Sequence, residues 1–301
     1  MENVLITGGT GLIGKKLSTL LLQEGYSVSH LSRSKSNHSG EIKTFHWNIG
    51  LGEMDENAIK NADHIIHLAG ASVAGGRWTK ERKEELCLSR IGSAMLLFSK
   101  LKKLNHPLKT FISASAVGYY GDGKDKWLAE DVPHGNDFLA NLCNDWESQT
   151  LQIKSLGIRT VVFRIGIVLS REGGALPELA RSMNFGAAVY MGDGRQYLSW
   201  IHLDDLCRAF LFAIKNKNME GIYNATAHEP ATNREMIDAI KKAKKSPALV
   251  LPAPAFALKL ALGEMSLALL AGQRCSSEKL RHGGFEFQHP DLANALHHLY
   301  S

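Results

Sequence analysis

The chain carries, near its start, the run Thr7-Gly8-Gly9-Thr10-Gly11-Leu12-Ile13-Gly14. It follows a short apolar segment, Val4–Thr7, and opens a stretch with helical spacing, Leu12–Glu24. A strand, a glycine-rich turn and a helix N-terminus in this order predict a dinucleotide-binding site, because the helix presents free N–H groups and a partial positive charge to a pyrophosphate. Gly8 permits the tight turn, Gly11 lets the backbone approach the phosphates, and Gly14 lets the helix pack closely on the sheet.

Strand and helix patterns then alternate over the first 165 residues. Helical spacing covers Leu12–Glu24, Thr79–Leu104 and Phe138–Leu156. Such alternation predicts an α/β fold, a Rossmann-type doubly wound parallel sheet with helices on both faces. The strands are expected at Val4–Thr7, Ser27–Ser32, Ile42–Trp47, Asp63–Leu68, Thr110–Ala114 and Arg159–Ile165.

The pattern loosens after residue 169. Residues 170–200 are rich in glycine and show few strand signals, and the helix Thr232–Ala243 has Thr232 as its expected cap. An apolar helix over Ala255–Ala271 is either core of a second lobe or a surface for a partner. We therefore expect a dinucleotide-binding domain over 1–169, joined by returning segments from 199–226, and a smaller mixed α+β substrate lobe over 170–301. The returning segments are two short strands, Ser199–Leu203 and Ile222–Ala225, and a helix, Asp204–Asn216.

Composition narrows the class of protein. The 301 residues carry a net charge of +5, and the lysine-rich run 241–245 has no interleaved aromatic residues, so nucleic acid is not an expected partner. A long apolar stretch, 249–272, contains two prolines and two charges, which argues against a membrane span. The four cysteines include no Cys-x-x-Cys pair, so we expect a reducing, cytoplasmic location and no metal site: Cys87, Cys143, Cys207 and Cys275.

The end of the second strand predicts which dinucleotide binds. A carboxylate about 20 residues past the glycines normally holds the ribose 2′-hydroxyl of NAD. Here the segment continues as Ser32, Arg33, Ser34 and Lys35, without a carboxylate. A hydroxyl, a guanidinium and an ammonium suit a 2′-phosphate, so NADP(H) is expected in preference to NAD(H). The alternative is that Arg33 is an ordinary surface residue after a strand.

Several motifs resemble the short-chain dehydrogenase/reductase superfamily, in its extended or atypical branch with the NAD-dependent epimerases and dehydratases. They are Gly8–Gly14, His67–Gly70 and Trp200–Asp205. The resemblance covers essentially the whole chain and extends to a subgroup known as epimerase family proteins, with its own C-terminal domain from about residue 247. The marks of the subgroup are Arg77-Trp78, Ser89-Arg90, Asp137–Ala140, Trp146-Glu147, Gly263-Glu264, Gly272–Arg274 and Gly283–Phe285.

The resemblance implies a set of cofactor-binding residues. They comprise the pyrophosphate turn, the 2′-phosphate pair, the segment after the fourth strand, two residues of the long helix and one residue past the sixth strand. By sequence alone, Arg90 has a second interpretation as a surface salt-bridge partner of Glu84 or Glu85. The set is Gly8, Thr10, Gly11, Leu12, Ile13, Gly14, Ser32, Arg33, Leu68, Ala69, Gly70, Glu85, Arg90 and Val168.

The superfamily's chemistry uses a Tyr-x-x-x-Lys pair on the helix after the fifth strand, where the lysine lowers the pKa of the tyrosine. In this chain Leu139 and Cys143 stand at the two positions, so we expect residues 105–165 to hold no such pair. Weak candidates for a catalytic role are Ser115, Tyr120 with its neighbour Tyr119, Asp137, Cys143 and His202.

Each candidate has a plain structural alternative. A tyrosine packs on its loop, Asp137 caps a helix, Cys143 is a small buried side chain and His202 is a satisfied structural histidine. Two functions remain open. The first is an NADP(H)-dependent oxidoreductase or epimerase of a small molecule, and the second is a non-catalytic NADP(H)-binding regulator. A homodimer is compatible with both.

Overall fold

The computed structural model describes residues 1–34 and 41–301, and a mostly parallel sheet organises the first part of the chain. Seven strands run parallel, and β4 pairs antiparallel with β3 at one edge. From β1 the order runs outward in both directions, which is the doubly wound arrangement expected from the sequence. Along the sheet the strands are β13 (Gly221–Ala225), β8 (Arg159–Ile165), β6 (Thr110–Ala116), β5 (His64–His67), β1 (Asn3–Thr7), β2 (Ser27–Ser32), β3 (Lys43–Asn48) and β4 (Glu53–Met54).

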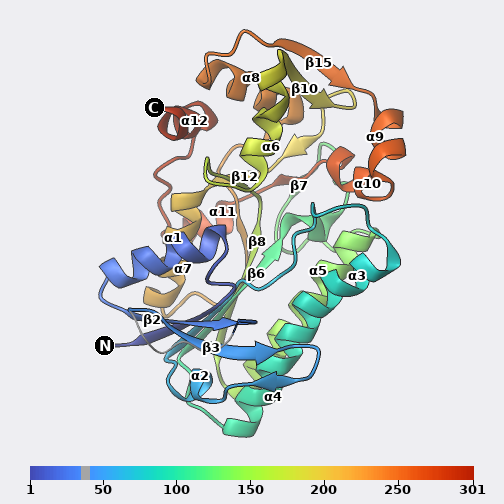
Figure 1. Cartoon of the computed structure of the whole chain (residues 1–301). Coiled ribbons are helices and arrows are strands. Elements are labelled where there is room, and N and C mark those ends of the chain that lie inside the picture. Colours follow the sequence, from blue (N-terminus) through green and yellow to red (C-terminus); the bar gives the residue numbers. More distant parts are fainter. Residues whose placement is uncertain (35–40) are drawn as a thin grey trace.

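Helices cover both faces of this sheet (Figure 1). α1 (Leu12–Gln23) packs beside α7 (Leu203–Lys215) on one face, and α4 (Ser93–Leu104) packs beside α5 (Phe138–Leu151) on the other. A short helix, α2 (Asn57–Lys60), adjoins α4. Neighbouring residues of β1 enter different core clusters, Leu5 with Phe111 and Ile6 with Phe210, because successive side chains of a strand point to opposite faces.

The predicted helix over Thr79–Leu104 is interrupted. It consists of α3 (Lys80–Cys87), a π-helical turn over Leu88–Gly92, and α4. The expectation of one continuous helix is therefore wrong at its centre. A π turn inserts an extra residue into the helix and redirects the side chains that it carries, which is common at functional sites.

A smaller lobe is built from the later part of the chain (Figure 1). β10 (Ala187–Met191) and β15 (Leu249–Ala253) pair in parallel, and α6 (Ala175–Arg181), α8 (Asn233–Ala243) and α12 (Leu292–Tyr300) pack on a third core cluster. The expected capping box of α8 is present between Thr232 and Glu235. β10 was not predicted, because its sequence begins with two alanines and its partner strand, β15, lies about 60 residues further along the chain.

Short strand pairs connect the segments around the lobe. Of the two strands expected to return to the sheet from 199–226, the second does so, since β13 pairs with β8, whereas the first pairs with another short strand outside the sheet. A short helix, α11 (Glu278–His282), follows the strand at Arg274–Cys275. The short pairs are β9 (Ile167–Leu169) with β12 (Trp200–His202), β11 (Tyr197–Leu198) with β14 (Ala231–Thr232), and β7 (Trp127–Leu128) with β16 (Arg274–Cys275).

The apolar helix expected over Ala255–Ala271 is two helices, α9 (Ala255–Leu262) and α10 (Met265–Leu270). They separate at Gly263, whose φ of +61° ends α9. α9 buries none of its residues, and Phe256 and Leu260 are 75% and 79% exposed. The prediction that this segment is core of the second lobe is therefore wrong for α9. Throughout residues 1–34 and 41–301, every helix is too short or too polar to cross a membrane.

Candidate cofactor-binding site

The glycine-rich turn lies between β1 and α1, beside the end of β5. Gly8 has a φ of +70°, and a Cβ on it would lie 3.1 Å from the backbone of Leu68. A Cβ on Gly14 would lie 2.5 Å from the carbonyl oxygen of Gly8. Glycine is required at both positions for α1 to begin this close to the sheet.

The N-terminus of α1 is open toward the turn. Gly11 is its N-cap, no side chain caps it, and its first turn contains no acidic residue. The free N–H groups and the helix dipole together favour an anion at this end. Gly8, Thr10 and Gly11 line the cleft in front of the helix. Leu12, Ile13 and Gly14 lie behind that lining, in the first turn of α1.

A chain of hydrogen bonds fixes the segment after β5. Thr7 Oγ1 accepts the amide N–H groups of Leu68 and Ala69 at 3.1 Å, so its own proton is donated to His67 Nδ1 at 2.7 Å. His67 Nε2 then carries the ring proton and donates it to Ser93 Oγ at 3.1 Å. Complete burial lowers the pKa of His67 to about 3, which keeps the ring neutral and the donor order intact. This series of hydrogen bonds holds the segment after β5, which forms one wall of the cleft, in place.

The cleft has a volume of about 810 Å³. Its walls come from the glycine turn, the ends of β2 and β3, the segment after β5, and α3 with the π-helical turn that follows it. Its size suits a cofactor-sized ligand. Of the predicted cofactor residues, the lining includes Gly8, Thr10, Gly11, Ser32, Arg33, Leu68, Ala69, Gly70 and Glu85. Gly9 of the predicted turn also lines the cleft but was not predicted to do so. The other lining residues that sequence reasoning missed are His30, Leu31, residues 46–50, Ala71, Ser72, Arg82, Leu88 and Ser89.

The end of β2 presents no carboxylate to the cleft. Arg33 is exposed and forms no ion pair with any residue that the structure describes. Ser32 Oγ accepts the amide N–H of Ser34 at 3.2 Å, which leaves the hydroxyl proton available. Lys35, the third residue predicted at a 2′-phosphate, lies outside the described residues.

Arg90 supports the cleft from behind. Its guanidinium donates to the carbonyl oxygen of Ala71 at 2.9 Å and lies 5.4 Å from the ring of Trp146. Glu85 pairs instead with Arg82. The alternative interpretation of Arg90 as a salt-bridge partner of a nearby glutamate is therefore wrong. The π turn turns this side chain inward from the helix.

Val168 lies on β9 and outside the lining of this cleft. Its carbonyl oxygen is 3.5 Å, and Leu12 Cδ2 is 3.3 Å, from where a Cβ on Gly174 would stand. Val168 and Leu12 therefore approach each other through this glycine. Gly173 also lies beside Leu12, so loop 170–174 packs against the start of α1.

Ser115 and Tyr120 belong to a buried hydrogen-bonded network. Ser115 Oγ donates to Glu147 Oε1 at 2.6 Å, and Arg164 donates to both carboxylate oxygens of Glu147 at 2.9 and 2.8 Å. Arg164 also donates to the hydroxyl of Tyr120 at 2.9 Å, and that hydroxyl donates to Asn224 Oδ1 at 2.8 Å. The charged side chains of the ion pair are only 1% and 4% exposed.

In this network, the hydroxyl groups of two predicted catalytic candidates, Ser115 and Tyr120, are already hydrogen-bonded to other side chains. Burial raises the pKa of Tyr120 well above its ordinary value, so the phenol stays protonated. Tyr119 lies with its ring centroid 3.4 Å from the guanidinium of Arg164. These contacts favour a structural role for both tyrosines, although their catalytic role stays a prediction.

The positions of the superfamily's tyrosine and lysine face Gly118. A Cβ on this glycine would lie 3.6 Å from Leu139 and 4.0 Å from the Cys143 sulfur, and burial raises the pKa of the Cys143 thiol to about 12. The expectation that residues 105–165 lack Tyr-x-x-x-Lys is wrong as a statement about spacing, because Tyr120 and Lys124 are four residues apart. Tyr120 ends a 3₁₀ turn after β6 rather than lying on α5, and its hydroxyl bonds to other partners.

Asp137 and His202 both cap helices. Asp137 Oδ1 accepts the amide N–H of Ala140 at 2.9 Å at the start of α5. His202 Nδ1 accepts the amide N–H of Asp204 at 3.0 Å at the start of α7. Burial, and then the proximity of His289, lower the pKa of His202 to about 4. The structure does not bring Asp137 and His202 into the lining of the cofactor cleft.

Contacts between α9–α10 and α3 tie the small lobe to the dinucleotide-binding domain. Arg77 donates to the carbonyl oxygen of Leu260 at 2.6 Å, and Lys83 pairs with Glu264 at 2.5 Å. A Cβ on Gly263 would lie 3.8 Å from Arg77 Nε, so two of the sequence marks, Arg77-Trp78 and Gly263-Glu264, meet across the lobes. Their spacing along the chain gives no indication of this contact.

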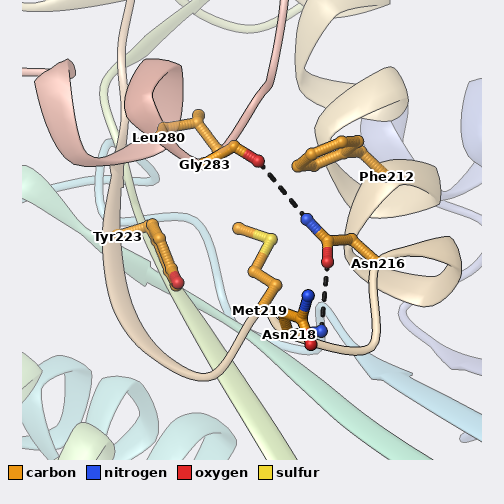
Figure 2. Close-up of a pocket in the computed structure, with 7 residues that line it drawn as sticks. All are labelled: Phe212, Asn216, Asn218, Met219, Tyr223, Leu280 and Gly283. Atoms are coloured by element: carbon orange, nitrogen blue, oxygen red, sulfur yellow. Dashed lines mark hydrogen bonds between the residues drawn. The ribbon is translucent and has the colours of Figure 1, made fainter.

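A second hollow, of about 150 Å³, lies where α7 ends (Figure 2). Asn216 donates to the carbonyl oxygen of Gly283 at 3.3 Å and accepts the amide N–H of Asn218 at 3.0 Å. The hollow shares no lining residue with the cofactor cleft and contains no charged side chain, so we assign it a structural role. Its other lining residues are Phe212, Met219, Tyr223 and Leu280.

Comparison with known families covers most of the chain. Residues 4–226 match the model of the NAD dependent epimerase/dehydratase family. The chain belongs to this family. Residues 253–299 match a domain of unknown function, DUF1731, and the resemblance seen in the sequence is thereby confirmed.

Relatives and a solved structure agree with this membership. The chain is 37% identical over 294 residues to an epimerase family protein of Mycobacterium leprae, covering 97% of this chain and 94% of that protein. It is 37% identical over 298 residues to epimerase family protein YfhF of Bacillus subtilis, covering 99% and 97%. Its fold is similar to the crystal structure of human epimerase family protein SDR39U1 with NADPH, at a TM-score of 0.88 and 27% identity over 99% of both chains.

Replacing Thr7 by valine tests the hydrogen-bonded wall. The variant keeps the shape of the side chain but removes the acceptor for two amides and the donor to His67, so it should lose about 1–3 kcal/mol of unfolding free energy and weaken NADPH binding. Urea unfolding and fluorescence titration measure the two effects. Thr160→Val is the matched control, because it removes a single bond from a buried hydroxyl far from the cleft. Equal NADPH affinity in both variants would show that Thr7 does not hold the wall.

Replacing Arg164 by methionine tests the buried ion pair. The single variant leaves Glu147 charged and unpaired, which should cost about 3–5 kcal/mol of unfolding free energy. The double variant Arg164→Met, Glu147→Leu should recover most of this loss, because no charge is then left buried. A double variant no more stable than the single one in urea unfolding would contradict this account.

Proposed function

We propose that this protein binds NADP(H) in preference to NAD(H). The observation that carries the proposal is the end of β2, where Arg33 lines the cleft without an ion-pair partner among the described residues and no carboxylate stands at Ser32, Arg33 or Ser34. An acidic side chain here would repel a 2′-phosphate, whereas a guanidinium binds one through two hydrogen bonds. The NADPH bound to human SDR39U1 supports the same preference.

We further propose that the protein is an oxidoreductase or epimerase of a small molecule. NADP(H) supplies or accepts a hydride when bound. This chain's glycine turn and the N-terminus of α1 hold the diphosphate, and Ser32 and Arg33 hold the 2′-phosphate. The resemblance places Val168 near the reactive end of the cofactor, and in this chain Val168 and Leu12 both lie beside Gly174. The unpaired cysteines support a reducing, cytoplasmic location.

A second function is favoured by the buried network. Ser115 donates to Glu147, and Tyr120 is bound by Arg164 and Asn224, so neither presents a free group for proton transfer. With Leu139 and Cys143 in place of the usual pair, the protein would bind NADP(H) without catalysis and act as a regulator. A regulator must bind NADP⁺ and NADPH with different affinities, since equal binding shifts no equilibrium.

Replacing Arg33 by alanine tests the cofactor preference. Loss of a charge-assisted contact to the 2′-phosphate should cost about 2–3 kcal/mol, which is about 30- to 150-fold in Kd for NADPH, with little change for NADH. Calorimetric titration with both cofactors measures the two values. Lys102→Ala, an exposed basic residue outside the cleft, is the control. An equal loss for the two cofactors would overturn the proposed role of Arg33.

Rapid mixing of the NADPH complex with carbonyl compounds and nucleotide sugars separates the two functions. Oxidation of bound NADPH by any member of the panel supports an enzyme. No oxidation, together with distinct calorimetric affinities for NADP⁺ and NADPH, supports the regulator. No oxidation with equal affinities contradicts both.

A further inference from the structure

Three histidines and an aspartate converge where α12 meets the start of α7. One donor atom from each of His202, Asp204, His289 and His298 lies within 4.8 Å of every other. They come from the β12–α7 junction, from the segment before α12 and from α12 itself. Across residues 1–34 and 41–301 this is the one group of its kind. No pattern in the sequence predicts this cluster, because almost 90 residues separate His202 from His289.

We propose that this cluster is a binding site for a divalent transition metal ion of the zinc class, held by His202, His289 and His298. Neutral imidazole nitrogens are the ligands that such ions prefer. His202 Nε2 and His298 Nδ1 are 3.2 Å apart, close to the roughly 3.3–3.4 Å between two donors of a tetrahedral zinc ion. The ring centroid of His289 lies 4.0 Å from the ring centroid of His202 and 4.5 Å from that of His298.

The three rings require only small movements to face one ion. His202 is buried, whereas His289 is half-buried and His298 is exposed, so the latter two rings have room to turn edge-on. The ring of His289 forms no hydrogen bond with any described residue that would oppose this rotation. With three imidazoles as ligands, water completes the tetrahedron on the exposed side of His298.

Asp204 orients the buried ligand. In the structure His202 Nδ1 accepts the amide N–H of Asp204, which leaves the ring proton on Nε2. When Nε2 binds the metal, the proton moves to Nδ1, which then no longer accepts the amide N–H of Asp204. The ring exchanges that bond for one donated to Asp204 Oδ2, which lies 4.0 Å from Nδ1 in the structure. A carboxylate behind a metal-bound histidine is a common arrangement that fixes the ring and strengthens the ligand. Lys16 pairs with the other oxygen of Asp204 at 2.9 Å.

The surrounding backbone already holds the ligands near one another. Asp205, fully buried, accepts the amide N–H groups of Gln288 and His289 at 2.8 Å, which fixes the segment before α12 against α7. A metal would add a second tie between α12 and the β12–α7 junction, beside α1. Metal binding should therefore stabilise the small lobe against the dinucleotide-binding domain.

Zinc titration of the untagged, chelator-treated protein tests the site. We expect one Zn²⁺ per chain by calorimetry, an increase of Tm on addition of Zn²⁺, and a tetrahedral absorption spectrum with Co²⁺. Loss of a residue that only hydrogen-bonds to a metal ligand already lowers metal affinity by about 10- to 100-fold. Loss of a ligand itself, in His298→Ala or His289→Ala, should therefore weaken Zn²⁺ binding by at least about tenfold. Neither substitution disturbs the cap of α7 or the bonds to Asp205.

His297→Ala is the matched control, because His297 is an exposed neighbour on α12 outside the cluster. Its Zn²⁺ affinity and its zinc-dependent increase of Tm should equal those of the unmodified protein. Circular dichroism and NADPH affinity confirm that each variant is folded. No stoichiometric binding by the folded protein, or an equal loss in His297→Ala and His298→Ala, would overturn the proposal in favour of adventitious binding by surface histidines.

Discussion

The close contact between Gly14 and the carbonyl group of Gly8 is the constraint on which the rest of the structure depends. A single added carbon would stand 2.5 Å from the carbonyl oxygen and push α1 away from β1. Because the contact is kept, the N-terminus of α1 opens between the ends of β1 and β5, where the strand order reverses. The walls of the cleft are then set by Thr7 and His67 on one side and supported by Arg90 beneath. An anion-binding end is thus held rigidly at the point where such sheets bind ligands.

The buried ion pair between Glu147 and Arg164 organises the part of the domain where the catalytic candidates Ser115 and Tyr120 lie. It stands on α5 and β8, next to the positions where a tyrosine and a lysine are expected. Its hydrogen bonds take up Ser115 and Tyr120 and reach Asn224 on β13. Ser115 and Tyr120 thus help to satisfy a buried ion pair, whose charges are costly to leave unpaired. These hydrogen bonds fix the positions of both side chains between α5, β8 and β13.

The sequence predicted the sheet well and the small lobe poorly. Buried parallel strands are continuous apolar runs between turns, so β1, β2, β5, β6 and β8 were found within about two residues. β10 and β15 have no such local signal, because each is stabilised by a partner about 60 residues away. The break at Gly263 and the π turn at Leu88–Gly92 also escaped prediction. Gly263, with a φ of +61°, is a local signal for the end of α9, whereas the π turn carries Arg90, which bonds to Ala71 on another segment.

By itself the sequence determined the dinucleotide-binding fold, the glycine turn and the absence of a carboxylate after β2, because each of these is a property of neighbouring residues. Only the tertiary structure decided what Tyr120, Asp137, Arg90 and His202 do. Each of these side chains has a local role that its residue type permits, and the choice is made by groups that folding brings within hydrogen-bonding distance. The same reason applies to His289 and His298, which approach His202 only after the chain has closed on itself. Spacing along a sequence specifies a turn or a helix face, but it does not specify which distant side chains meet.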